Sequence, residues 1–407
     1  MLRPPKARWA ASECARRAIS SVGQGRGPAA QDHVARKAVV LSNGVIGAEK
    51  QAIALAEAVG LPFTVLDACK ASDTGMPAAF RGLPTWVQLL IRRPDAATCL
   101  DIAEPVPPML AISCGRGSIP ASIALRAATG GRTLTVHVQR PDCDDGLFDL
   151  VVAPRHDYPP CAASRGPNVL VTDGSLHRVT PCSLRGAREA WKGELEMWPA
   201  PRLAMLVGGT VRRRVWQRPL APDLTPDIAR ELVDSALRAT REAGGSLLVA
   251  SSRRTPELVR VAIDETLQVS GSGGDSASSQ YRPPPIHYGP DSDPNPYLGL
   301  LACADYILAT ADSINMVSEA CGAAKPVYVA RPRECARRFL AFHERMLTTG
   351  RTREWQGTLE PQSAWAVAAA NGNGNGGAEP QQLFSDVELA AVRIRDILGR
   401  RGHLQNP

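Results

Sequence analysis

Residues 297–330 constrain the fold more than any other segment, because helical and strand patterns alternate within a short stretch of chain. The unbroken apolar run at 306–309 is typical of a strand that is buried on both faces of a parallel sheet. A polar turn, a helical segment and a second apolar run at 326–330 follow it. Such a unit forms a right-handed crossover between parallel strands. It therefore predicts an α/β fold with its ligand site at the carboxyl edge of the sheet.

The polar turn and the helix after it carry groups that suit a nucleotide. We expect Asp312 and Ser313 to accept hydrogen bonds from the free amides of the helix, and Gly322 to take the left-handed position at its end. Glu319, beside Ser318, lies where a carboxylate can accept both hydroxyls of a ribose while the helix N-terminus faces phosphate. The alternative is an ordinary capped core helix, because Asp312 would repel a diphosphate. Both interpretations stay open at this stage.

Composition bounds the class of protein. A chain of 407 residues with 44% hydrophobic content can form two domains with full cores. No run of 18 or more apolar residues occurs, so any membrane role is predicted to be peripheral. The formal charge of +7 is concentrated at 1–37, where eight Lys or Arg residues stand against Glu13 and Asp32. Because the rest of the chain is nearly neutral, the basic balance predicts no nucleic-acid partner.

The basic tail over 1–36 is rich in Arg, Ala and Ser. It is similar in composition to an organelle transit peptide, and a disordered basic extension that touches anionic lipid or an acidic partner is the alternative. The ten cysteines are scattered singly, without the Cys/His spacing of a zinc site. We therefore expect no bound metal, and import into an organelle stays open.

Two series of alternating strands and helices predict two tandem doubly wound, Rossmann-like domains. The first domain is expected at 37–195 and the second at 201–345, with a flexible insertion at 270–285. A low-complexity linker at 346–383 and a helix at 384–402 are expected to follow. The expected strands are 38–42, 63–67, 109–113, 133–139, 149–153 and 169–172 in the first domain, and 203–207, 246–251, 306–309 and 326–330 in the second.

Three loops of the second domain are predicted to converge at the carboxyl edge of its sheet. Gly208 and Gly209 directly follow a strand, where glycine lets backbone amides approach phosphate, although an ordinary tight turn has the same sequence. Thr255 is expected to cap the helix after the next strand. The candidate nucleotide-binding residues are Gly208, Gly209, Thr210, Ser252, Arg253, Asp312, Ser313, Ser318 and Glu319.

Loops of the first domain are expected to face the same crevice. His156 and Asp157 follow a strand and are weak candidates for a general-base pair, with a structural loop histidine as the alternative. The chain has no GxSxG motif, no Walker A loop and no paired carboxylates typical of a hydrolase, so the catalytic residues stay unknown. The other candidates in the first domain are Asn43, Gly47, Ser113, Gly115 and Arg116.

Several segments together resemble the mitochondrial-fission family that is named for elongated mitochondria. The resemblance covers about residues 38–345, and its most specific clusters are PRHD, SSRRTP and TADSINMVSEA. It implies a fold like that of the two-domain GT-B nucleotide-sugar transferases, with a C-terminal helix that returns to the first domain. It also places Glu319 where those enzymes bind ribose, and Gly208 and Gly209 where their phosphate loop begins. Thr210 stands where those enzymes usually have another glycine.

The resemblance implies two functions of different classes. In the first, the protein is a peripheral adaptor without catalytic activity that helps a dynamin-related GTPase localise to the mitochondrial outer membrane. It then acts at the cytosolic face of that membrane or in the cytosol. In the second, it is a glycosyltransferase that binds a nucleotide-diphosphate sugar in the crevice between the domains. We expect the first function, and the resemblance identifies neither a sugar nor an acceptor.

Overall fold

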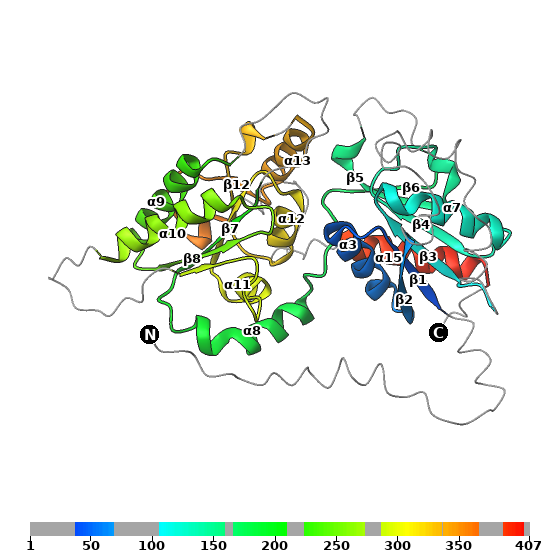
Figure 1. Cartoon of the computed structure of the whole chain (residues 1–407), viewed down its shortest axis with the longest axis horizontal. Coiled ribbons are helices and arrows are strands. Elements are labelled where there is room, and N and C mark those ends of the chain that lie inside the picture. Colours follow the sequence, from blue (N-terminus) through cyan, green and yellow to red (C-terminus); the bar gives the residue numbers. More distant parts are fainter. Residues whose placement is uncertain are drawn as a thin grey trace.

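The computed structural model shows two α/β lobes that lie side by side (Figure 1). The basic tail, Thr210 and most of the insertion lie outside the described residues, so the expectations about them stay predictions. The structure describes residues 37–68, 106–158, 166–209, 224–272, 286–335, 337–365 and 386–402.

The first domain is built on a six-stranded sheet in the order β2-β1-β3-β4-β5-β6, in which every pair of neighbours is parallel. Its apolar runs are buried on both faces, as the unbroken pattern of β1 and β3 predicts. Its strands are β1 (Ala38–Ser42), β2 (Phe63–Asp67), β3 (Leu110–Cys114), β4 (Leu134–Val138), β5 (Leu150–Pro154) and β6 (Val169–Thr172).

Helices cover both faces of the first sheet. Helix α7 (Ile119–Ala128) packs against one face, and α3 (Ile46–Val59) packs against the other together with α15 (Asp386–Arg400). Helix α15 comes from the end of the chain and buries Val387 and Ile394 in the core of the first domain. The prediction of a closing C-terminal helix is confirmed, and Phe384 lies outside the described residues.

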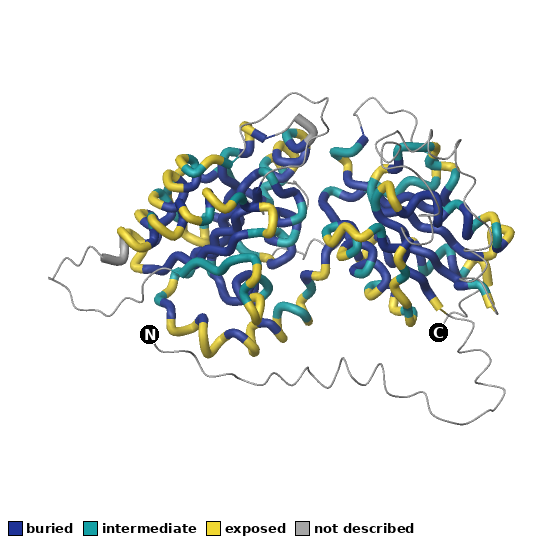
Figure 2. Tube along the Cα trace, viewed as in Figure 1, coloured by how far each residue is buried: buried dark blue, intermediate teal, exposed yellow. Residues whose placement is uncertain are grey.

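The second domain repeats the architecture with a sheet in the order β12-β11-β10-β7-β8-β9, again with parallel neighbours. Figure 2 shows the strands of both lobes buried beneath helices that are exposed on their outer sides. The strands are β7 (Arg202–Val207), β8 (Ser246–Ser251), β9 (Ile286–Tyr288), β10 (Tyr306–Thr310), β11 (Val327–Ala330) and β12 (Arg353–Glu354). The helices are α8 (Pro181–Leu195), α9 (Pro226–Glu242), α10 (Glu257–Ser272), α11 (Tyr297–Cys303), α12 (Ile314–Gly322) and α13 (Arg337–Thr348).

Helix α8 packs on the second domain, although we expected residues up to 195 to belong to the first. Its buried face, with Trp191 and Leu195, contributes to the core that lies under α11. A side chain on Gly299 of α11 would overlap the Trp191 ring, so the two helices approach each other closely. The connection between the domains therefore lies before α8.

Residues 346–365 are ordered, whereas we expected a low-complexity linker over 346–383. Trp355 and Trp365 are buried, and both contact the Tyr328 ring edge-on with centroid distances of 5.2 Å. The Trp355 indole also donates a 2.8 Å hydrogen bond to Ser235. Aromatic burial of this kind stabilises the outer edge of the second sheet. The expected linker can therefore begin only after residue 365.

Candidate functional site

A cleft of about 290 Å³ lies between the two domains at the carboxyl edges of their sheets. This is where ligands bind in open parallel sheets. Its position agrees with the expected crevice, since loops from both halves of the chain line it. The lining residues are Gln139, Pro154, His156, Asp157, Ser175, Arg254, Asp312, Ser313, Ile314, Asn315 and Phe339.

The Asp312 carboxylate occupies the loop that we expected to hold phosphate. Its Oδ2 accepts a 2.5 Å hydrogen bond from the amide of Gly209, while the amide of Gly208 donates to the Thr310 hydroxyl at 2.8 Å. The expectation that Asp312 and Ser313 cap α12 is wrong, because Ser313 occupies the N-cap position without a side-chain cap hydrogen bond. The carboxylate instead satisfies an amide of the glycine loop.

Close contacts leave room only for glycine at both positions of this loop. A Cβ on Gly208 would overlap the Asp312 carboxylate, and a Cβ on Gly209 would overlap the backbone carbonyl of Arg254. Neither glycine has a positive φ angle, so the requirement is for space rather than for backbone conformation. The glycine pair therefore brings the β7, β8 and β10 loops together, and the ligand seated against it is the carboxylate of the protein itself.

The loop after β8 contributes Arg254 to the cleft rather than the expected Arg253. The Arg254 guanidinium lies 4.0 Å from Asp312 Oδ2, and Arg254 is a lining residue of the cleft. Ser252 Oγ donates a 3.1 Å hydrogen bond to the Gly208 carbonyl. The Thr255 hydroxyl also bonds this carbonyl and accepts from the Ser252 amide, so it ties loops together where we expected a helix cap.

The two candidate residues on helix α12 are not among the described residues that line the cleft. The Tyr297 hydroxyl donates a 2.5 Å hydrogen bond to Glu319, and burial raises the pKa of that carboxyl group. The Ser318 hydroxyl accepts a 3.1 Å hydrogen bond from the amide of Ser175 in the first domain. Gly322 lies inside the helix, where a Cβ would meet the His177 ring, and the left-handed residue beyond it is Ala324.

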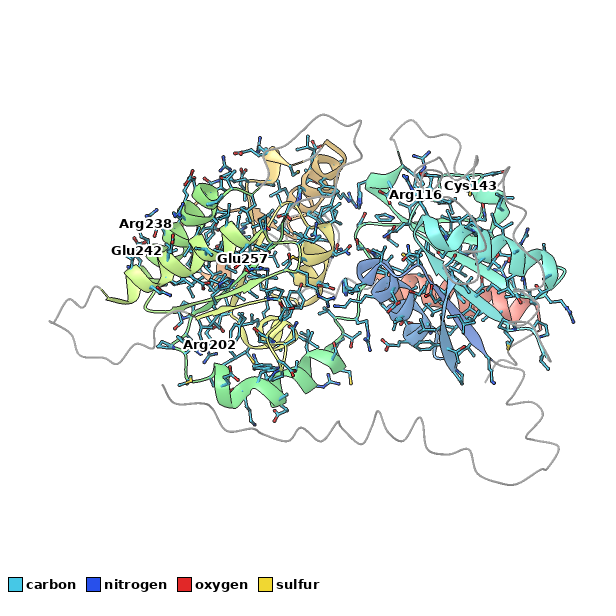
Figure 3. All side chains as sticks on the ribbon, in the orientation of Figure 1. Arg116, Cys143, Arg202, Arg238, Glu242 and Glu257 are labelled. Atoms are coloured by element: carbon cyan, nitrogen blue, oxygen red, sulfur yellow. The ribbon has the colours of Figure 1, made fainter. Side chains whose placement is uncertain are left out.

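The candidates of the first domain are spread over different environments. Ser113 is fully buried, and its Oγ lies 2.8 Å from His137 Nδ1, so it belongs to the core rather than the cleft. Gly115 has φ +77° and packs against the Asn43 side chain. Arg116 pairs with Asp142 at 2.5 Å, and Figure 3 shows it beside Cys143 in the first domain.

Residues of α3 contact the second domain. Gln51 donates a 3.5 Å hydrogen bond to Asn315 of α12, and Gly47 lies beside the same amide group. A Cβ on Gly47 would lie 3.4 Å from Asn315 Nδ2, at van der Waals contact distance. The two domains are therefore in direct contact at the cleft, and Gly47 serves that contact.

His156 and Asp157 both line the cleft, but they are not joined by a hydrogen bond of ordinary length. His156 Nε2 lies 3.7 Å from Asp157 Oδ1, and the His156 ring packs edge-on against Phe342 at a centroid distance of 5.5 Å. Gln139, which sequence reasoning missed, also lines the cleft and has a φ of +75°. Such backbone strain clusters at ligand sites, so it is a signal that only the structure reveals.

A network around Asp173 joins the domains beside the cleft. The Asp173 carboxylate accepts from Arg155 at 3.3 Å and from Arg345 of the second domain at 3.4 Å. The first residue of α15, Asp386, accepts hydrogen bonds from the amides of Gly174 at 2.7 Å and of Asp173 at 3.4 Å. The closing helix therefore holds the loop through which the first domain contacts the second.

We expect Asp386→Asn to stabilise the protein in a pH-dependent manner. Burial and the nearby Asp173 raise the pKa of Asp386 to about 7. The folded state thus binds a proton more tightly than the unfolded state, and this stabilisation is lost as pH rises from about 4 through 7. Asparagine keeps one acceptor oxygen for the 2.7 Å bond from the Gly174 amide without the buried charge, and gives up the longer bond from the Asp173 amide. Urea unfolding should show the variant gaining about 2 kcal/mol over wild type between pH 5 and pH 8.

The exposed carboxylate Glu388 of the same helix provides the control. Glu388→Gln should follow the wild-type pH dependence, because its side chain is solvated and pairs with Arg395 at the surface. Parallel curves for Asp386→Asn and wild type from pH 5 to pH 8 would contradict the assignment of a buried titrating group at Asp386.

The described parts of the chain bear on two further roles, metal binding and membrane insertion. No group of three His, Cys, Asp or Glu side chains there is arranged to hold a metal ion. None of the helices in the same residues has the length and apolar character needed to cross a membrane.

Comparison with known proteins places the chain in a family. The profile described as Mitochondrial fission ELM1 matches residues 46–372. The mitochondrial fission protein ELM1 of Arabidopsis thaliana is 29% identical over 313 residues, which cover 72% of this chain and 65% of that protein. The uncharacterized protein RP120 of Rickettsia prowazekii (strain Madrid E) is 24% identical over 262 residues, which cover 57% of this chain and 67% of the relative.

The fold is shared with sugar-nucleotide enzymes. A crystal structure of UDP-N-acetylglucosamine 2-epimerase superimposes with a TM-score of 0.50 at 14% identity, covering 91% of this chain and 96% of that one. This similarity confirms two Rossmann-like domains in a GT-B arrangement and shows the fold alone. The family profile, in contrast, covers far more than half of the sequence. The chain therefore belongs to the Mitochondrial fission ELM1 family.

Proposed function

We propose that the protein is a mitochondrial fission factor that acts as a peripheral adaptor. In this role its GT-B body helps a dynamin-related GTPase localise to the cytosolic face of the mitochondrial outer membrane. Family membership supports the fission role. The adaptor proposal rests on the hydrogen bond between Asp312 and the Gly209 amide. Through this bond the Asp312 carboxylate occupies the loop that a catalytic relative would use for phosphate.

The position of Asp312 weighs against a diphosphate ligand on physical grounds. Its carboxylate accepts the hydrogen bond from the Gly209 amide that a phosphate oxygen would need. It also places a negative charge where the two phosphate groups of a diphosphate would bring further negative charges. Arg254 lies 4.0 Å from the same carboxylate, so part of its charge is already balanced. A body that keeps the fold without an open phosphate loop is suited to binding a protein partner.

The adaptor proposal predicts a cellular result. Cells that lose this protein should have longer mitochondria, and the tagged protein should associate with mitochondria and with the dynamin-related GTPase. Protease protection of full-length protein and of a variant that lacks 1–36 separates surface attachment from import. A tagged protein that never reaches mitochondria or the GTPase would refute the adaptor. Full protection inside an organelle would refute the cytosolic-face location.

A nucleotide-sugar-dependent glycosyltransferase is the second candidate function. The observation in its favour is the polar cleft of about 290 Å³, in which His156 and Asp157 of the first domain face Arg254 of the second. The cleft lies where a GT-B enzyme joins donor and acceptor, and His156 would be its general base. An open phosphate loop is the feature that this function needs and that Asp312 closes.

We expect Asp312→Ala to create nucleotide binding that wild type lacks. The change frees the Gly209 amide, removes the charge and leaves Arg254 to pair with phosphate. With 5 mM UDP, GDP or ADP and a Kd of about 1 mM, binding adds about 1 kcal/mol of stability. A thermal-shift assay should then show a Tm rise of about 1–2 °C in the variant and none in wild type. The exposed Asp291→Ala is the matched control.

The outcomes of this assay separate the two functions. Stabilisation of wild type by one of the nucleotides at millimolar concentration would favour the glycosyltransferase over the adaptor. No shift in Asp312→Ala with any nucleotide would show that the carboxylate is not what closes the loop. A shift in Asp291→Ala as large as that in Asp312→Ala would mark the effect as nonspecific.

A further inference from the structure

Three side chains form one hydrogen-bonded chain in the second domain, outside the set that lines the interdomain cleft. Ser251 Oγ lies 2.5 Å from Nε2 of His287, and Nδ1 of the same ring lies 2.8 Å from Asp264 Oδ1. A hydroxyl, an imidazole and a carboxylate linked in this order are the parts of an activated serine nucleophile. Ser251 and His287 are 36 residues apart and Asp264 and His287 are 23 apart, on three different elements, so no short motif reveals them.

The fold positions each of the three hydrogen-bonded side chains. Ser251 is the last residue of β8, and β9 runs parallel to β8 with His287 paired to Val249. Because side chains alternate along a strand, Ser251 and Val249 share one face of the sheet, and His287 points to that face as well. Helix α10 covers this face through Ile263, which brings its neighbour Asp264 to the imidazole.

The carboxylate determines the roles of the two ring nitrogens. An ionised carboxylate only accepts hydrogen bonds, so His287 Nδ1 carries the proton that Asp264 accepts. Nε2 of the same ring is then the acceptor for the Ser251 hydroxyl. The Ser251 residue is 9% exposed and the His287 side chain 5%, whereas the Asp264 side chain is 52% exposed. The hydroxyl and the base are thus shielded from bulk water, and the acid orients the base from the surface.

The chain contains a natural control for this arrangement. Ser113 and His137 also form a Ser–His pair, at 2.8 Å through Nδ1. No hydrogen-bond partner of His137 Nε2 occurs among the described residues, so this pair lacks the third, acidic member. Burial also lowers the pKa of His137 to about 3, which makes it a weak base. The acidic partner Asp264 is therefore what distinguishes the Ser251–His287 pair from the Ser113–His137 pair.

We propose that Ser251 is a nucleophile that cleaves carboxylic esters, with His287 as general base and Asp264 as its positioning residue. The Ser251 oxygen attacks the ester carbonyl, and its proton moves to His287 Nε2. An oxygen–carbon bond to Ser251 forms, the carbon–oxygen bond to the alcohol breaks, and His287 gives the proton to the leaving alcohol. Water then repeats the attack on the acyl group, which releases the acid and restores Ser251.

Diisopropyl fluorophosphate tests the nucleophile directly, because the serine oxygen forms a bond to phosphorus while fluoride leaves. Full-length wild type should acquire one adduct by intact mass, and peptide mapping should place it on Ser251. Ser251→Ala should lose the adduct, and His287→Ala should label at least 100-fold more slowly. The rate at which Ser251→Ala and His287→Ala hydrolyse p-nitrophenyl acetate should fall in the same order, through a lower kcat rather than a changed KM.

Asp264 is tested by its conservative variants. Asp264→Asn should slow labelling at least 10-fold and Asp264→Glu should recover most of the rate, whereas a merely structural role would change only the Tm. Ser113→Ala should label like wild type. Folded wild type without an adduct on Ser251 would overturn the proposal even if Ser251→Ala fails to fold. Labelling that is independent of His287 would overturn it as well. Neither result bears on mitochondrial shape, so the adaptor function is judged separately.

Discussion

Gly209→Ala lowers the free energy of unfolding by about 1–3 kcal/mol, the usual range for a group forced into a packed site. The added methyl group meets the backbone carbonyl of Arg254, which is held in place because the hydrogen bonds of Ser252 and Thr255 fix its loop. Backbone atoms cannot move aside as a side-chain end can. The glycine loop must therefore shift, which breaks the bond between Gly209 and Asp312.

Urea unfolding of Gly209→Ala beside Gly289→Ala measures this effect. Gly289 has no heavy atom within 4 Å of a built Cβ and no positive φ angle, so alanine there should be neutral or slightly stabilising. A larger loss of stability in Gly289→Ala than in Gly209→Ala would contradict the close contact. The size of the effect also reports how rigidly the three loops of the second domain are joined.

Acidification destabilises the wild type through buried histidines, and His343→Gln removes a share of this effect. Burial, with a smaller contribution from His156, lowers the pKa of His343 to about 4. The folded state binds fewer protons than the unfolded state between pH 4 and 6.5, so the stability present above pH 6.5 is lost as pH falls through 4. Each pKa unit corresponds to about 1.4 kcal/mol, which sets an upper limit of about 3 kcal/mol for His343.

Glutamine at 343 can still donate a hydrogen bond to the Ala311 carbonyl, which His343 Nε2 contacts at 2.8 Å. The difference in unfolding free energy between variant and wild type should therefore change by about 2 kcal/mol in favour of the variant from pH 7 to pH 4.5. Buried His177, whose pKa is lowered to about 4, contributes in the same direction in both proteins. Parallel curves for the two proteins would exclude His343 as a source of acid sensitivity.

The strands of both sheet centres were predictable because a fully buried parallel strand is an unbroken apolar run. Ala38–Ser42 and Ser246–Ser251 end where the sequence predicts, and Leu110–Cys114 is displaced by one residue. The edge strands Ile286–Tyr288 and Arg353–Glu354 were missed because they are short and carry polar residues. Tertiary pairing with a neighbouring strand defines them, and no local pattern does.

The sequence predicted which loops form the candidate site, but not which side chains within them make contact. Strand ends placed Gly209 and Asp312 at one edge of the sheet, but their mutual hydrogen bond joins residues that are 103 positions apart. Charge alone cannot choose between Arg253 and Arg254, since the turn after β8 decides which side chain reaches the cleft. The alternation of buried and exposed positions carried no signal for Gln139, whose backbone conformation is set by the fold.

The return of α15 to the first domain has a consequence for how the chain acquires its structure. Val387, Ala391 and Ile394 complete a core whose strands lie near the start of the sequence. A ribosome releases this helix only after the whole second domain has been made, so until then α3 covers its part of the face of the first sheet and the part under α15 stays exposed. Contacts of such long sequence separation slow folding. Synthesis therefore exposes the first domain to chaperones for longer than the second, and excising residues 37–195 alone would leave the apolar surface under α15 permanently uncovered.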